Sequence, residues 1–219
     1  MTEKMIQLLI TGIGETLYMV VISTVVAYVF GIPLGVIMYI TDKKGICRNR
    51  IINLVVGVII NIIRSVPFLI LLVAILPFTR LVVGTTIGPT ATIVPLIVAA
   101  IPFVARMVES SLKEVDGGVI EAAKAMGSSN FQIITRVLLP EAKPSLLVGL
   151  TIAITTILGY SAMAGFTGGG GLGAIATNYG YYRYQTDVML ITVAVLVIIV
   201  QIFQEVGIRI VNKLDKRLK

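Results

Sequence analysis

The sequence contains no histidine and a single cysteine, Cys47, among its 219 residues. One cysteine cannot form an internal disulfide. Without histidine, the chain lacks the commonest general base and the commonest zinc ligand. We therefore expect no metal, no cofactor and no catalytic residue in this chain.

Charge is also scarce. Only 13% of the residues are charged while 57% are hydrophobic, and the mean hydropathy is +0.99. A soluble domain carries charge on about a quarter of its residues. These proportions predict an integral membrane protein, and the chain has room for five crossings of about twenty residues each with the gaps between them. The net charge of +7 does not indicate nucleic-acid binding, because no run of five like charges occurs.

Five apolar segments predict an all-α integral membrane protein with one transmembrane domain over residues 1–219. Arg64 interrupts the second segment, and Pro67 follows. Two alternatives remain for this segment: one long tilted helix, or an interfacial part up to Ile63 and a crossing that begins near Ser65. Residues 165–187 are predicted to be an external loop. The predicted helices are 15–41, 51–79, 81–106, 144–165 and 188–208, and we expect the first to be retained rather than cleaved as a signal peptide.

The distribution of Lys and Arg predicts an orientation. Fourteen of these residues fall in the first gap, in the charged stretch 106–143 and in the C-terminal tail. Lys4, Arg80 and Arg183 fall in the alternate gaps, and Arg64 lies within a segment. Because positive residues hold loops in the cytoplasm, we expect an external N-terminus, and a loop 107–143 and a C-terminal tail that are cytoplasmic. An odd number of crossings cannot form two equal inverted halves, so a symmetric pathway would need a second copy.

The loop 107–143 carries the clearest motif. Small alanines would let a short helix lie close to a partner, a glycine would end that helix, and Ser128 or Ser129 could cap the next one. A proline would close this second helix before the fourth crossing. This order predicts a helix–turn–helix that projects from the membrane, and the simpler alternative is an ordinary amphipathic surface helix. The residues concerned are Glu121, Ala122, Ala123, Gly127, Leu139 and Pro140.

At these residues the sequence resembles the permease family of binding-protein-dependent ABC importers. The signature of that family is EAA, three residues, G, nine residues, I, one residue, LP, and Val137 stands here in place of the isoleucine. The resemblance extends over nearly the whole chain and is strongest to the methionine-importer permeases, at residues 14–20, 64–68, 101–106 and 168–184.

The resemblance implies a type I ABC importer permease fold with five transmembrane helices, in the bacterial cytoplasmic membrane. It implies that the motif is a coupling helix in a cleft of a cytoplasmic ATPase. It also implies a complex of two permease copies, two ATPase subunits and an extracytoplasmic binding protein that delivers D- or L-methionine. A permease for another amino acid or small solute is the alternative within this class.

Other residues have both a functional and a simpler structural interpretation. Arg64 could line a pathway or pair with Glu109, or its stem could snorkel to the surface. Tyr160, Ser161 and Met163 could line a pathway for a small amphipathic substrate, or only fill helix contacts.

Two features argue against other functions. The glycine-rich stretch 168–173 lacks the following Lys-Ser or Lys-Thr of a phosphate-binding loop, and the chain has no such loop elsewhere, so ATP hydrolysis would need a partner. We expect this stretch to be a flexible external loop. An ion-gradient-driven carrier is disfavoured because the predicted crossings within 16–105 and 144–182 contain no carboxylate.

Overall fold

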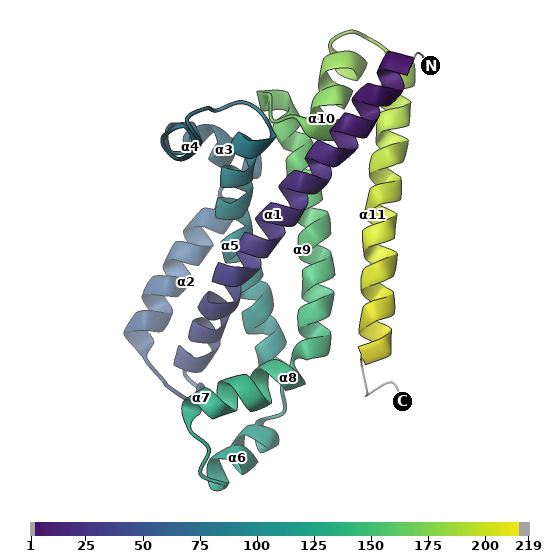
Figure 1. Cartoon of the computed structure of the whole chain (residues 1–219). Coiled ribbons are helices and arrows are strands. Elements are labelled where there is room, and N and C mark those ends of the chain that lie inside the picture. Colours follow the sequence, from purple (N-terminus) through teal and green to yellow (C-terminus); the bar gives the residue numbers. More distant parts are fainter. Residues whose placement is uncertain (1–2, 215–219) are drawn as a thin grey trace.

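The computed structural model describes residues 3–214, and every regular element in this range is helical. Four long helices run along the molecule: α1 (Glu3–Thr41), α5 (Pro89–Lys113), α9 (Lys143–Ala164) and α11 (Thr186–Leu214). Between α1 and α5 the chain rises through α2 (Arg50–Ser65) and the short helices α3 (Phe68–Ala74) and α4 (Leu76–Val83). Figure 1 shows that α1, α5 and α11 run in one direction along the molecule, whereas α2 and α9 run in the opposite direction. The last five residues of the predicted cytoplasmic tail lie outside the described range.

Four helices are long and apolar enough to cross a membrane, and α2 with α3 makes a fifth if the bent pair counts as one span. The two helices of this pair meet at an angle of 101°. Pro67 causes the break, because a proline disfavours helical backbone in the preceding residue, and Val66 is extended at φ −84 and ψ 124. The prediction of one unbroken helix over 51–79 is therefore wrong. A new helix does begin after Ser65, but α3 has seven residues, which are too few to form the separate crossing that the alternative expected there.

The helix boundaries also differ from the predictions elsewhere. α1 begins at Glu3 rather than at residue 15, and α5 runs from Pro89 to Lys113 rather than over 81–106. α5 continues past Arg106 because its charges at spacings of three and four pair along the helix, so they do not end it.

The predicted external loop 165–187 is largely helical. It contains the 3₁₀ turn Gly165–Thr167, the helix α10 (Gly171–Ile175) and the π-helix Ala176–Tyr181. Two side chains of α1 cap the start of α10: Glu15 Oε2 accepts the Gly171 N–H at 2.6 Å, and Thr16 Oγ1 accepts the Leu172 N–H at 2.9 Å. These contacts fold residues 168–173 against α1, so the expectation of a flexible loop is wrong.

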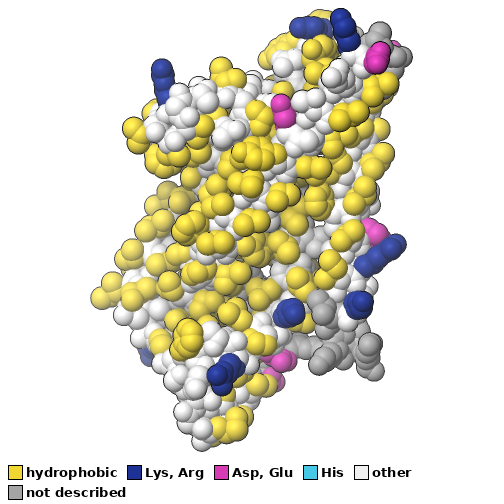
Figure 2. Space-filling view, in the orientation of Figure 1, with side chains coloured by type: hydrophobic (Ala, Val, Ile, Leu, Met, Phe, Trp, Pro, Cys, Tyr) yellow, Lys and Arg dark blue, Asp and Glu magenta, His cyan; other side chains and the backbone are white. Residues whose placement is uncertain are grey.

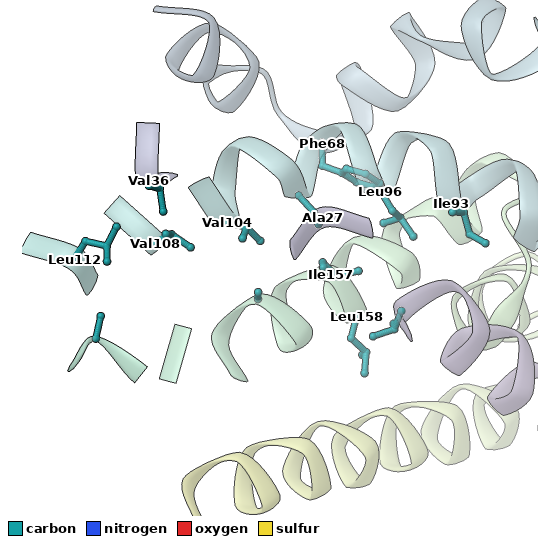
Figure 3. Packing of buried hydrophobic residues seen from close by; sticks show 14 of the residues in the cluster. Ala27, Val36, Phe68, Ile93, Leu96, Val104, Val108, Leu112, Ile157 and Leu158 are labelled. Atoms are coloured by element: carbon teal, nitrogen blue, oxygen red, sulfur yellow. The ribbon is translucent and has the colours of Figure 1, made fainter. Parts of the chain in front are cut away.

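The core lies between α1, α5 and α9, with Phe68 added from α3 (Figure 3). The α1–α5 contact is the most extensive. A Cβ atom at Gly35 would lie 2.6 Å from the Ala105 carbonyl oxygen and 2.6 Å from Val108 Cβ. Only glycine lets the two backbones approach this far, as in other closely packed membrane helices.

The molecule has two polar ends. Figure 2 shows charged side chains gathered toward these ends, with an apolar surface between them. The α1–α2 connection and α6 to α8 lie at one end, and α10 and the start of α1 lie at the other (Figure 1). This distribution suits a protein whose middle faces lipid.

Candidate functional site

The predicted helix–turn–helix is present at the end of α5. Its first helix is α6 (Gly117–Ala125), which begins at Asp116, whose carboxylate accepts the Gly118 N–H at 2.6 Å. At the other end, the Gly127 N–H donates to Lys124 O at 2.9 Å and the Ser128 N–H donates to Ala123 O at 3.1 Å. Gly127 has φ +77, so these are the two bonds of a Schellman motif with its left-handed glycine. The role expected of Gly127, to end the helix, is the one observed.

Ser129 caps the second helix through a capping box. Its hydroxyl accepts the Gln132 N–H at 3.3 Å, and Gln132 Oε1 accepts the Ser129 N–H at 2.8 Å. The helix then continues as α7 (Asn130–Gln132), the π-helix Ile133–Leu138 and α8 (Leu139–Glu141). Caps at both sides of the turn hold the two helices in one arrangement.

Pro140 does not close the second helix as predicted. It lies near the start of α8, and the chain turns into α9 only after Ala142. A proline inside a helix lacks an N–H and collides with the carbonyl four residues earlier. The preceding turn is π-helical, with the Leu139 N–H bonded to Ile134 O, which is a wider arrangement that suits a proline at the next position.

The motif residues face in different directions. Ala123 is 2% exposed and Ile120 is 8% exposed, and both join the main core with Ile133 and Leu138 of the second helix. Ala123 therefore holds the two helices together and is not available to a partner, unlike the role expected of both alanines. The outward surface carries Glu121 and Ala122, with the exposed apolar side chains of Met126 and Phe131 beside the turn. Leu139 is half-buried against the core, and Pro140 is exposed.

A network of charged side chains lies on α5, just before the helix–turn–helix begins. Glu109 on α5 is 5% exposed, and its carboxylate contacts Arg106 Nη1 and Lys113 Nζ, each at 2.7 Å. Lys113 also lies 3.4 Å from Asp42, which follows α1, and Arg106 Nη2 donates to Asn61 Oδ1 of α2 at 2.8 Å. The backbone N–H of Lys43, and then Lys113, hold the pKa of the Asp42 carboxyl below its usual value. The network thus joins α5 to α1 and α2.

Arg64 does not pair with Glu109, whose carboxylate binds Arg106 and Lys113. Arg64 lies exposed in the last turn of α2, just before the break, and no salt bridge to it is present within residues 3–214. The predicted pair is therefore wrong. The Glu109 carboxylate, which was the expected partner, binds two cations of its own helix.

The three pathway candidates on α9 occupy different environments. Tyr160 stacks on Phe68 of α3, with ring centroids 4.5 Å apart and planes 3° apart. Ser161 is 1% exposed and its hydroxyl donates to Leu158 O at 2.7 Å, so it presents no surface outside this chain. Met163 is 46% exposed. Arg64 and Met163 are the candidates that the fold leaves open to solvent, lipid or a second copy.

Comparison with known proteins identifies the family of this chain. The family described as "Binding-protein-dependent transport system inner membrane component" matches residues 31–219. The chain belongs to this family. The permease is 52% identical over 210 residues to the probable D-methionine transport system permease protein MetI of Vibrio cholerae, which covers 96% of this chain and 93% of the relative. It is 44% identical over 203 residues to the methionine import system permease protein MetP of Bacillus subtilis, covering 93% of this chain and 91% of the relative.

Solved structures agree with this assignment. The permease matches a chain of an inward-facing MetNI methionine ABC transporter with a TM-score of 0.97 and 48% identity, covering 99% of this chain and 100% of the other. An amino acid ABC transporter solved with histidines matches with a TM-score of 0.79 at 21% identity, over 96% and 95% of the two chains, which shows the fold alone. The chain is thus a multi-pass permease subunit of an ABC importer, with the type I importer permease fold.

Sequence reasoning missed two parts of the permease. Arg106 and Glu109 are three residues apart, and Glu109 and Lys113 are four apart. Both are spacings of helix ion pairs, and they could have predicted that the third helix extends past Arg106. The capping of α10 by Glu15 and Thr16 joins residues 156 positions apart, and no local pattern indicates it.

Proposed function

We propose that this permease imports methionine, D or L, as part of a complex of two permease copies and two cytoplasmic ATPase subunits. An extracytoplasmic binding protein would deliver the substrate. The names of the curated relatives and the methionine transporter with the near-identical fold support this substrate. The permease chain would perform no covalent chemistry, and ATP hydrolysis would belong to the partner.

One observation carries the coupling part of the proposal. The helix–turn–helix of residues 117–141 is fastened internally by its caps, yet it exposes large apolar side chains. Met126 is 79% exposed and Phe131 is 74% exposed, and both flank the outward face that carries Glu121 and Ala122. A rigid projection with exposed large apolar side chains suits insertion into a cleft on another protein.

The mechanism that we propose follows from the connections of this projection. Closure of the ATPase subunits on ATP would draw the two projections together. Ile120 and Ala123 fix α6 to the second helix, and the Glu109 network fixes α5 to α1 and α2. The displacement would therefore pass into the membrane helices as a rigid-body movement, from inward-facing to outward-facing.

The orientation is part of the proposal. The end with α6 to α8 would lie in the cytoplasm, the N-terminus outside and the C-terminus inside. The excess of Lys and Arg in the gaps at that end supports this orientation. Arg64 and Met163 are proposed as pathway-facing positions, whereas Tyr160, stacked on Phe68, and the buried Ser161 are proposed as helix contacts.

The test is uptake in proteoliposomes that contain this permease with its ATPase and binding protein. We expect ATP-dependent uptake of labelled methionine, with other amino acids competing weakly. Preferred uptake of another amino acid would assign a different substrate within the same class. Uptake that needs no ATPase would contradict the proposal altogether.

A charged substitution tests the coupling surface. Ala122→Arg should leave the complex assembled, as judged by co-purification, and leave some ATP hydrolysis, but it should abolish the uptake that normally accompanies hydrolysis. Normal uptake at normal subunit levels would show that the exposed face of α6 does not transmit the movement.

A further inference from the structure

We propose that the corner between α1 and α2 is a binding site for the headgroup phosphate of an anionic phospholipid. A cavity of about 470 Å³ lies at this corner, at the end of the molecule that carries α6 to α8. Three of its lining side chains are cationic, namely Lys43, Arg48 and Arg50. The other lining residues are Thr41, Asp42, Asn53 and Leu54.

The charges on this cavity are unbalanced. Within the described range 3–214, no salt bridge is present at Lys43, Arg48 or Arg50. The single carboxylate in the wall, Asp42, is already engaged by the backbone N–H of Lys43 at 2.6 Å and by Lys113 at 3.4 Å. Three cationic groups around one cavity repel one another, and a phosphate with its several acceptor oxygens would neutralise them.

The other polar side chains of the corner make hydrogen bonds within the chain, so the three cationic side chains would bind the phosphate. Asn53 Nδ2 donates to Met38 O at 2.8 Å, and Thr41 Oγ1 donates to Ile37 O at 2.6 Å. Asn49 accepts the first free N–H groups of α2, from Ile51 and Ile52, each at 3.1 Å. The helix terminus itself is therefore capped and is not the anion site.

The apolar surroundings identify the anion as a lipid. Leu54 lines the cavity and is 63% exposed, and Ile51 at 75%, Val55 at 51% and Val58 at 46% continue this exposed face along α2. A phosphate in the cavity would hold a headgroup while its acyl chains lie along these side chains. Basic pockets beside membrane helices on the cytoplasmic side recognise anionic headgroups in this way. A free phosphate or an acidic protein segment would make no use of the apolar wall.

The corner is also connected to the coupling projection. Asn130 Nδ2, in the second helix of the projection, donates to Cys47 Sγ at 3.1 Å, and Asp42 contacts Lys113 of the Glu109 network. A lipid that holds the corner would therefore steady the base from which the projection extends. This consequence rests on the proposed coupling role, whereas the binding site itself does not.

The test is native mass spectrometry of the intact transporter in detergent, titrated with phosphatidylglycerol or phosphatidylcholine. The wild type should bind phosphatidylglycerol in preference. Arg48→Gln with Arg50→Gln should weaken that binding by about 30-fold, from the usual contribution of two basic residues at an anionic surface. Arg48→Lys with Arg50→Lys should largely retain it, which separates loss of charge from a folding defect.

The matched control removes two charges elsewhere. Lys44 lies in the same connection but does not line the cavity, and Arg209 is an exposed residue of α11 paired with Glu205. Lys44→Gln with Arg209→Gln should bind phosphatidylglycerol like the wild type. Equal loss in this control, equal binding of both lipids, or full competition by millimolar inorganic phosphate would overturn the proposal. These measurements need neither methionine nor ATP, so a failed uptake assay would not affect them.

Discussion

Gly127→Ala should loosen the turn of the helix–turn–helix of residues 117–141 by a predictable amount. Gly127 has φ +77, and a Cβ atom there would meet nothing within 4 Å. Steric clash with neighbours is therefore absent, and only the backbone conformation is disfavoured. An L-residue in this conformation costs about 1–2 kcal/mol. Local opening of the turn should become about 5–30 times more frequent.

Gly117→Ala is the matched control. Gly117 lies in the same projection and also has open space around its Cβ position, but it occupies the first position of α6 with an ordinary helical backbone. Alanine favours a helix over glycine by up to about 1 kcal/mol. This variant should leave the turn unchanged or slightly more stable, although the number of atoms added is the same.

Hydrogen exchange of the backbone amides at 127 and 128 measures the effect directly, because these two N–H groups make the bonds of the turn. Exchange should accelerate about 5–30-fold in Gly127→Ala and less in Gly127→Asn, since asparagine tolerates the left-handed region better than alanine does. Wild-type exchange in Gly127→Ala, or equal acceleration in Gly117→Ala, would refute the reasoning from φ.

Three further predictions concern other parts of the permease. Glu109→Ala should destabilise the complex by about 2–3 kcal/mol, which is near the low end for a broken buried ion pair because Lys113 is half exposed. Thermal unfolding should show this loss of stability, whereas Glu114→Ala should leave the unfolding temperature unchanged. Ser129→Ala should destabilise the second helix of residues 117–141 by about 1 kcal/mol, because this helix loses its N-terminal cap. Faster hydrogen exchange of the amides in its first turn should show the loss. Gly171→Ala, with φ +69 and a Cβ 2.6 Å from the Thr16 hydroxyl, should lower the yield of folded permease, whereas Gly14→Ala, with nothing within 4 Å, should not.

The sequence was sufficient where the physical causes are local. The apolar segments predicted the all-helical membrane fold, because a bilayer crossing leaves a run of uncharged residues. The turn of the helix–turn–helix of residues 117–141 was also predictable, because Gly127 and Ser129 act on backbone groups within a few positions of themselves. In both cases the residues that determine the structure are neighbours in the chain.

Prediction failed where distant residues decide the structure. The stretch 168–173 has the composition of a loop, and it folds because Glu15 and Thr16 supply acceptors from the other end of the chain. The face that Ala123 presents depends on Ile133 and the second helix, which the motif spacing does not specify. The predicted pair of Arg64 and Glu109 failed for a local reason instead, because Glu109 has cations three and four positions away on its own helix.

The α1–α5 pair connects both ends of the permease. At the end with α6 to α8, Asp42 contacts Lys113 beside the helix–turn–helix of residues 117–141, and at the opposite end Glu15 and Thr16 hold α10. Between these ends, the backbone of α1 at Gly35 packs directly against the Ala105 carbonyl oxygen and the Val108 side chain of α5. Such a close interface resists sliding, because any change of register would bring a larger side chain against the Ala105 carbonyl. We infer that α1 and α5 move together, so that a displacement of the projection reaches the capped glycine-rich segment across the membrane without passing through the bent pair of α2 and α3.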